Sequence, residues 1–290
     1  MFPKVHLLLL CSFALAILLG LVIGAQFVSQ RVSIVEDSGS VANAGYFFLY
    51  ILFATALLLF FLHYYKGRKM FFYAELLLEF SALQILLSLF LSEFHSFALA
   101  LAAVAARVLF AQLKQALLFL ASVVVGALLG SSFDLIPALV LSFLLAAYDY
   151  FAVFKSKHMV VLAKELQKRE AAFAIQFTAP PSPAVGKALG KKAGGRKEGK
   201  KEGKPEGVSG KGGRGESILL GTGDFVIPVL LCVSVLKSSV ISALATGVGA
   251  FVGLSVLLFV MQKTKGYYPA LPPIVLFSSL FYALSLLLSF

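Results

Sequence analysis

The sequence contains nine apolar stretches, each long enough for an α-helix to cross a lipid bilayer. A spanning helix needs about 17–25 largely apolar residues, because the hydrocarbon core is about 30 Å thick. Of the 290 residues, 60% are hydrophobic and 13% are charged, a composition that excludes an ordinary soluble domain. The stretches also lack the alternation, about ten residues long, of a membrane β-barrel strand. We therefore predict an all-α, polytopic membrane protein with nine transmembrane helices.

The first apolar stretch is longer than that of a cleaved signal peptide, so we interpret it as a retained first helix. The loops between the third and sixth stretches are very short, which predicts a compact series of antiparallel hairpins. The nine predicted helices are Val5–Phe27, Tyr46–Leu62, Phe71–Leu91, Phe94–Phe110, Ala116–Ser132, Leu135–Phe154, Ile218–Leu236, Val240–Met261 and Pro272–Leu288.

The basic residues between the stretches predict the orientation of the chain. With a cytoplasmic N-terminus, the short inner segments hold eight Lys and Arg residues and the outer segments hold two. Since cytoplasmic loops carry the excess of Lys and Arg, we expect the N-terminus inside and the C-terminus outside.

The segment 155–217 is the one long polar stretch, and it separates helices one to six (1–154) from helices seven to nine (218–290). It holds 15 Lys and Arg against 6 Asp and Glu, a net +9 of the chain's +11. Residues 155–177 have apolar positions at helical spacing, which predicts an amphipathic extension along the membrane surface. Residues 178–217 are rich in Lys and Gly, which predicts a disordered linker attracted to anionic headgroups. Without stacking aromatic residues, this segment does not indicate nucleic-acid binding.

Several polar residues within the apolar stretches have structural interpretations. Glu75 and Glu79 share one face of the third helix, where they could be interfacial or pair with a nearby Lys. Asp134 precedes the sixth helix, where we expect it to cap that helix. Cys11 and Cys232 have the spacing of neither a metal site nor a disulfide framework. The sequence predicts no metal and no cofactor.

Asp149 and Asp224 are harder to explain, because a carboxylate among apolar residues is costly. At 1.5 Å per residue, each lies about 9–10 Å from the cytoplasmic end of its helix, the sixth and the seventh respectively. Two carboxyl groups at matching depth on consecutive antiparallel helices could reach each other and share a proton. An aspartic protease needs this arrangement, and it also suits a proton-coupled transporter.

Two further motifs lie near the expected membrane depth of Asp149 and Asp224. Gly221 and Gly223 open the seventh helix, where they permit either irregular backbone or close helix packing. Pro269, Pro272 and Pro273 prevent a regular helix at the start of the ninth stretch. An extended backbone there could pair with an extended substrate.

Together these motifs resemble the presenilin and signal peptide peptidase family of intramembrane aspartyl proteases, which have nine spans. The motifs are Tyr148-Asp149, Gly221-Thr222-Gly223-Asp224 and Pro269-Ala270-Leu271, in the family's order and on the expected spans. The resemblance implies an aspartic endopeptidase with Asp149 and Asp224 as the catalytic pair. It also implies that the other motif residues shape the active site and that the substrates are transmembrane segments of peptides or proteins.

The compact length indicates a microbial, archaeal-type presenilin homologue in the plasma membrane of its cell. The Lys- and Gly-rich loop differs from presenilin's apolar self-cleavage segment, so autoproteolysis is not predicted. Homo-oligomerisation stays open, and no obligatory protein partner is evident. A cation channel or proton-coupled transporter is one alternative. A prepilin-type peptidase, which also uses Gly-x-Gly-Asp, is another, although the Lys expected soon after its Asp is absent here.

A second Pro-Ala-Leu occurs at Pro137-Ala138-Leu139. It lies twelve residues before Asp149, about 18 Å along the helix and on the opposite side of the membrane. We assign it no catalytic role.

Overall fold

Nine α-helices make up most of the described part of the chain, which covers residues 4–64, 68–110, 112–156, 174–178, 217–263 and 268–288 of a computed structural model. Each predicted span overlaps one helix, which confirms the all-α, polytopic architecture. The helices are α1 (Lys4–Ser29), α2 (Val41–Tyr64), α3 (Arg68–Ser88), α4 (Glu93–Leu109), α5 (Leu113–Ser132), α6 (Leu135–Phe151), α9 (Gly223–Leu236), α10 (Val240–Lys263) and α11 (Leu271–Leu288).

By length and composition, five helices in the described residues can cross a membrane: α1, α5, α6 with the turn that follows it, α10 and α11. Shorter apolar segments lie in α2 and α9. Large apolar side chains are exposed on many of the helices, for example Leu18, Phe53 and Leu287. Because a soluble protein rarely exposes such extensive apolar surface, the bundle is that of an integral membrane protein.

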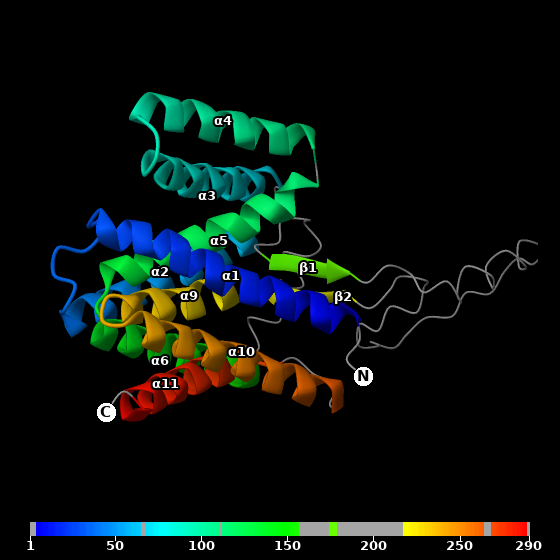
Figure 1. Ribbon diagram of the computed structural model, residues 1–290. Coiled ribbons are helices and arrows are strands. Elements are labelled where there is room, and N and C mark those ends of the chain that lie inside the picture. The colour runs from blue at the N-terminus through cyan, green and yellow to red at the C-terminus, as the bar shows by residue number, and fades with distance from the viewer. Residues whose placement is uncertain are drawn as a thin grey trace, which may run out of the picture.

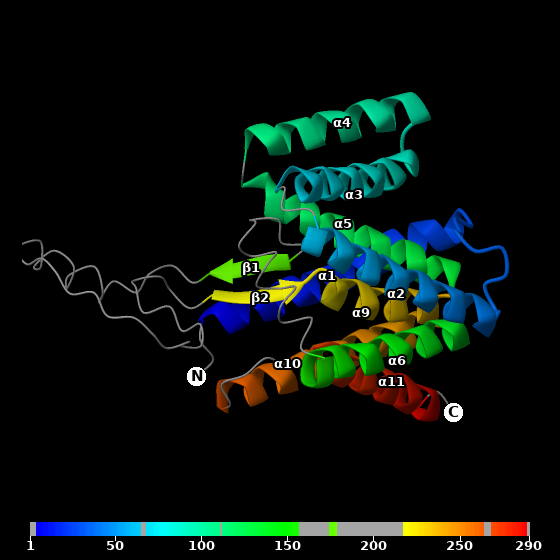
Figure 2. The ribbon, with the colours of Figure 1, turned by 180° about the vertical axis from the view of Figure 1, so that it is seen from behind.

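The helices run antiparallel along the bundle, and the α3–α4 hairpin stands at one edge (Figures 1 and 2). We call the end of the bundle at which α6 finishes and α9 begins the site end, and the opposite end the far end. The α4–α5 connection, the start of α3 and both strands described below also lie at the site end.

Helix α9 lies in the core between α1 and α5, where four glycines allow very close contact. Two glycines on α1 and two on α5, spaced four residues apart in each helix, face the same pair of valines on α9. A carbon atom added at any of them would approach an atom of α9 to within 2.4–2.7 Å. Small residues at a helix interface let the backbones approach closely, and this packing holds α9 against α1 and α5. The residues are Gly20, Gly24, Gly126 and Gly130, against Val229 and Val233.

Gly126→Ala is expected to lower the free energy of unfolding by about 1–3 kcal/mol, because overpacking a close contact forces backbone shifts. The new methyl carbon would lie 2.7 Å from the Val226 carbonyl oxygen. Gly45→Ala on α2 is the matched control, since an added carbon there meets no atom within 4 Å. Thermal unfolding in detergent, followed by circular dichroism, compares the two. Equal effects would contradict the close packing of α5 on α9.

A similar contact positions α11 against α10. Carbon atoms added at Gly249 and Gly253 would lie 2.4 Å and 2.6 Å from the carbonyl oxygens of Phe277 and Pro273. The backbones of α10 and α11 therefore touch directly, and the proline-rich start of α11 is fixed relative to the core.

Two segments depart from the sequence prediction. Residues Ala174–Thr178 (β1) and Ser217–Gly221 (β2) form an antiparallel two-stranded sheet, with Ala174 opposite Gly221 and Thr178 opposite Ser217. The prediction that the seventh helix begins at Ile218 is therefore wrong, and α9 begins at Gly223. A short apolar run such as Ile218–Leu220 fits a strand as well as a helix, and its pairing partner lies far away in the sequence.

The predicted amphipathic extension, residues 155–177, also differs where the structure describes it. Residues Ala152–Ser156 form a π-helical turn (η1) at the end of α6, and Ala174–Thr178 form β1 rather than helix. The rest of that prediction, and residues 179–216 of the predicted linker, lie outside the described residues.

Candidate active site

Asp149 lies in the last turn of α6 at the site end, with 8% of its surface exposed. The backbone N–H of Leu271 donates a hydrogen bond to its Oδ2 atom over 3.2 Å, and the backbone of Ala270 also bonds this carboxyl group. The start of α11 therefore holds the side chain of Asp149, although the two are 122 residues apart.

Asp224 lies in the first turn of α9 and is held from the other side. The backbone N–H of Gly221, the last residue of β2, donates a hydrogen bond to its Oδ2 atom over 3.1 Å. The N-terminal end of a helix also favours a negative charge. Asp149 is close enough to act electrostatically on Asp224. The structure thus brings the two predicted aspartates together.

The residues that follow Asp224 fix its position in the core. Phe225 is fully buried, and its ring lies 5.9 Å from that of Phe13 on α1 and 5.6 Å from that of Phe119 on α5. Pro228 lies inside α9. Because proline has no N–H, the carbonyl group of Asp224 lacks its usual helical hydrogen bond. The backbone carbonyl of Asp224 is therefore without its helical partner, while the Phe225 side chain that follows it is tightly packed in the core.

The Gly221-Thr222-Gly223 segment forms the junction between β2 and α9. A carbon atom added at Gly221 would lie 3.4 Å from Oδ2 of Asp224, whereas at Gly223 it would meet nothing within 4 Å. The Thr222 carbonyl accepts the N–H groups of Phe225 and Val226 and so starts the helix. A side chain at Gly221 would therefore touch the carboxyl group of Asp224, whereas the space at Gly223 is open.

The Pro269-Ala270-Leu271 segment is the second wall of the site. Pro269 and Ala270 are buried, and Ala270 belongs to the same apolar cluster as Leu220 and Phe225. Leu271 is the first residue of α11, and the two prolines after it occupy the first turn, where a missing N–H costs little. The sequence motif indicated this segment, but not that its backbone N–H groups contact Asp149.

Tyr148 directly precedes Asp149, but its ring and hydroxyl group contact α2. Its ring lies 6.5 Å from that of Phe48 on α2, and its hydroxyl group forms a hydrogen bond with Thr55 on the same helix. Tyr148 therefore connects α6 to α2. Its predicted role in shaping the active site is a proposal.

Asp134 lies at the far end, away from this site, as its interpretation as a structural residue predicts. It occupies the N-cap position of α6, but its side chain does not cap the helix. Its carboxylate instead pairs with Lys237 at the end of α9, over 3.0 Å, and accepts a 3.1 Å hydrogen bond from Ser38. Although partial burial opposes it, the contacts with Lys237 and Ser38 hold the pKa of Asp134 below its ordinary value of 3.8.

Asp134→Asn is expected to leave peptide cleavage largely unchanged and to cost at most about 1 kcal/mol of stability, since both side chains of the ion pair are partly exposed. Because the folded-state pKa is lowered, the contribution of the ion pair is complete above the ordinary pKa and is lost as the pH falls through the lowered value. Unfolding temperatures of both proteins across the acidic range check this. Abolished cleavage in a folded Asp134→Asn protein would contradict the assignment.

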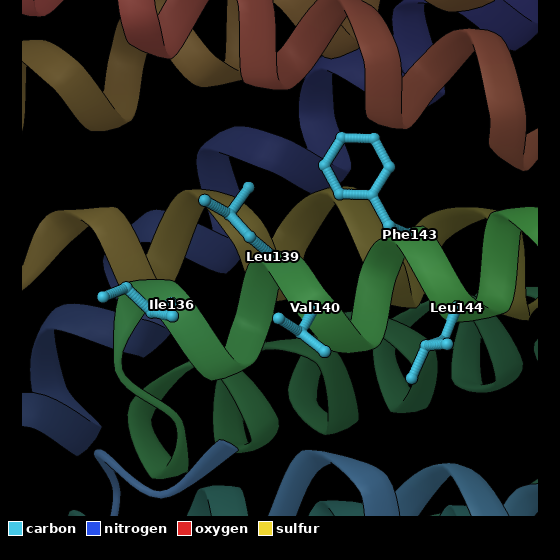
Figure 3. A pocket seen from close by; sticks show the side chains of 5 residues that line it. All are labelled: Ile136, Leu139, Val140, Phe143 and Leu144. Carbon is cyan, nitrogen blue, oxygen red and sulfur yellow. The ribbon is translucent and has the colours of Figure 1, made fainter.

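The second Pro-Ala-Leu also lies in the far half of α6. Leu139 contributes to an apolar groove of about 370 Å³ on the surface of this helix, which Figure 3 shows with Ile136, Val140, Phe143 and Leu144. The groove contains no ionisable side chain and therefore no group for acid–base chemistry. Among the described residues, no cluster of three or more His, Cys, Asp or Glu side chains could hold a metal ion.

The fold and this site define a class of molecule: a polytopic membrane protein in which two carboxyl groups from neighbouring helices interact at one end of the bundle. Residues 6–280 match the family model described as signal-peptide peptidase, presenilin aspartyl protease. Because the match covers nearly the whole chain, the protein belongs to this family of intramembrane aspartate proteases.

Solved structures support the fold independently. Two structures of a presenilin family intramembrane aspartate protease, in P2 and C222 space groups, superpose with TM-scores of 0.59 and 0.58 at 24% sequence identity. The alignments cover 95% and 96% of this chain and 96% and 97% of those chains. A search of curated proteins finds no match.

Proposed function

We propose that this protein is an intramembrane aspartyl endopeptidase in which Asp149 and Asp224 form the catalytic pair. The observation that carries the proposal is the geometry of the two carboxyl groups. They lie on different helices, interact electrostatically, and are each oriented by a backbone N–H from a separate segment. Two carboxyl groups in this relation can divide the roles of base and acid.

In the proposed reaction, one aspartate is ionised and the other carries a proton. The ionised carboxylate takes a proton from a water molecule, whose oxygen forms a bond with the carbon of the substrate carbonyl. The protonated carboxyl group donates its proton to the carbonyl oxygen, which gives a neutral gem-diol. A proton then passes from the first carboxyl group to the amide nitrogen, the C–N bond breaks, and the second carboxylate regains a proton as the new carboxyl group forms.

The substrates would be transmembrane segments of peptides or proteins, unwound where they are cut. An extended substrate backbone would add to the outer edge of β2, which leads directly to Asp224. The open space at Gly223 would admit this backbone, and the Pro269-Ala270-Leu271 segment would line it from the side of Asp149. The remaining motif residues, Tyr148, Gly221 and Thr222, would shape the same region.

The basic residues support a site end that faces the cytoplasm, with the C-terminus outside. We propose the plasma membrane of a microbial cell as the location, with the lipid bilayer and transmembrane substrates as partners and with homo-oligomerisation left open. The family match lends no support to a channel, a transporter or a prepilin-type peptidase.

The purified protein in detergent or lipid nanodiscs, incubated with a fluorescently labelled transmembrane peptide, tests the proposal. Mass spectrometry should find paired fragments whose masses sum to the peptide plus one water. The absence of such fragments for several transmembrane peptides, from a protein shown to be folded, would overturn the proposed function.

A further inference from the structure

Four charged side chains join α3, α4 and α5 at the site end, apart from the two aspartates. Arg107 of α4 lies 2.7 Å from Glu75 and 2.9 Å from Glu79, both on α3. Lys114 of α5 lies 3.1 Å from Glu75. We call these four residues the charge cluster. The sequence left open whether the two glutamates pair with a nearby Lys. The structure shows that Lys114 pairs with Glu75 and that Arg107 pairs with both glutamates.

The charge cluster is buried, but several of its polar atoms lack a well-formed hydrogen bond. The side chains of Glu75 and Glu79 are 0% exposed and that of Arg107 is 3% exposed. One oxygen of Glu75 and both oxygens of Glu79 nevertheless lack a hydrogen bond of good geometry, as does one terminal nitrogen of Arg107. Polar atoms that are buried without a well-formed hydrogen bond gain free energy from contact with water. Opening the cluster would therefore recover part of the cost of burying it.

Outside the charge cluster, the α3–α4 hairpin contacts the rest of the bundle along only part of its length. Its main contacts outside itself are with α5, and it forms one edge of the bundle in both views (Figures 1 and 2). Between the middle parts of α3 and α5 lies an apolar groove of about 360 Å³, lined by residues that include Leu78, Ser81 and Val125. The groove borders one face of the contact between α3 and α5, while Ala82 and Leu83 of α3 stay packed in the apolar clusters that α5 shares.

The far end of α3 is held differently. The side-chain N–H of Gln30, next to the end of α1, donates to the carbonyl of Leu89 over 3.2 Å, and Leu86 and Leu89 pack against the main core. The hairpin is thus tied by apolar packing and one hydrogen bond at the far end. At the site end it is tied by the charges together with a small apolar cluster that includes Leu76 and Leu117.

We propose that Arg107 latches the α3–α4 hairpin onto α5, and that the hairpin swings outward about its far end when the charge cluster opens. Arg107 is the centre of this latch because it contacts both glutamates, while its guanidinium carbon also lies 5.7 Å from the centre of the Phe72 ring. Removing Arg107 leaves two carboxylates facing each other, with Lys114 as the basic side chain that still contacts them among the described residues. Opening would widen the groove between α3 and α5 towards the bilayer. The inference does not depend on the proposed chemistry of Asp149 and Asp224.

Hydrogen–deuterium exchange of the full chain in lipid nanodiscs tests the latch. Arg107→Met introduces an uncharged, apolar side chain of similar length. We expect it to raise the rate of amide exchange across α3 and α4 by about tenfold or more, while the rates in α6 and α9 stay the same. Replacing Arg107, Glu75 and Glu79 all by Met should reverse the effect, because apolar residues can replace a buried ion network without loss. Lys263→Gln, which removes a basic residue at the same end but outside the cluster, should change nothing in the hairpin.

Two outcomes would overturn the proposal. Unchanged exchange in the Arg107→Met hairpin would mean that the charge cluster does not hold it closed. An equal rise in exchange across α6 and α9 would mean that Arg107 supports the whole fold rather than a separately opening hairpin. If Arg107→Met cannot be purified, the milder Lys114→Gln variant should show the same local pattern at lower amplitude, and a uniform pattern there would contradict the latch equally.

Discussion

Asp149→Asn and Asp224→Asn are each expected to lower the rate of transmembrane-peptide cleavage by about a thousandfold or more, since neither role in the reaction can be filled by an amide. Asparagine keeps the size of aspartate and an oxygen that can accept the hydrogen bonds from Leu271 and Gly221. The fold should therefore survive. Cleavage rates of the purified variants, measured with the same labelled peptide, check the prediction.

The same two variants separate catalysis from stability. A buried carboxyl group is costly to desolvate, and an amide is less so, so neither substitution should lower the unfolding temperature appreciably. Asp134→Asn is the matched control, because it makes the identical chemical change at the far end of α6. Full cleavage by either Asp149→Asn or Asp224→Asn would exclude the catalytic pair, even if the unmodified protein cleaves peptides.

The side chains at the site were predictable from the sequence because their positions follow from helix geometry. Nine apolar stretches set the number of crossings, and equal distances from the cytoplasmic ends placed Asp149 and Asp224 at one depth. The family motifs then named Gly221 and the Pro269-Ala270-Leu271 segment as neighbours. Along a regular helix, the number of residues between two positions gives the distance between them directly.

The parts that the sequence did not predict depend on contacts between distant segments. The N–H groups that hold Asp149 and Asp224 belong to the backbone, which leaves no mark in residue identity. Strand β2 formed where a helix was predicted, because its partner β1 is about forty residues earlier. Likewise, Arg107 follows Glu75 by 32 positions, so only the tertiary structure shows that they pair.

Leu271→Pro is expected to lower the rate constant of cleavage by about 10–100-fold, because it removes the N–H that donates to Asp149. A hydrogen bond to a charged group contributes about 1.5–3 kcal/mol, which corresponds to this range of rates if the bond orients the reacting carboxyl group. Proline is well tolerated at the first position of a helix, which Leu271 occupies in α11. The substitution should therefore remove the donor without breaking the helix.

Leu271→Ala separates the backbone effect from the loss of the leucine side chain, since alanine is shorter but keeps the N–H. We expect Leu271→Ala to affect mainly the apparent affinity for the peptide and Leu271→Pro to affect mainly the maximal rate. Steady-state cleavage kinetics of both variants, with unfolding temperatures to confirm that α11 is intact, distinguish these effects. If both variants lowered the maximal rate equally, the side chain of Leu271 would be the important group, and the hydrogen bond to Asp149 would not orient the catalytic carboxyl group.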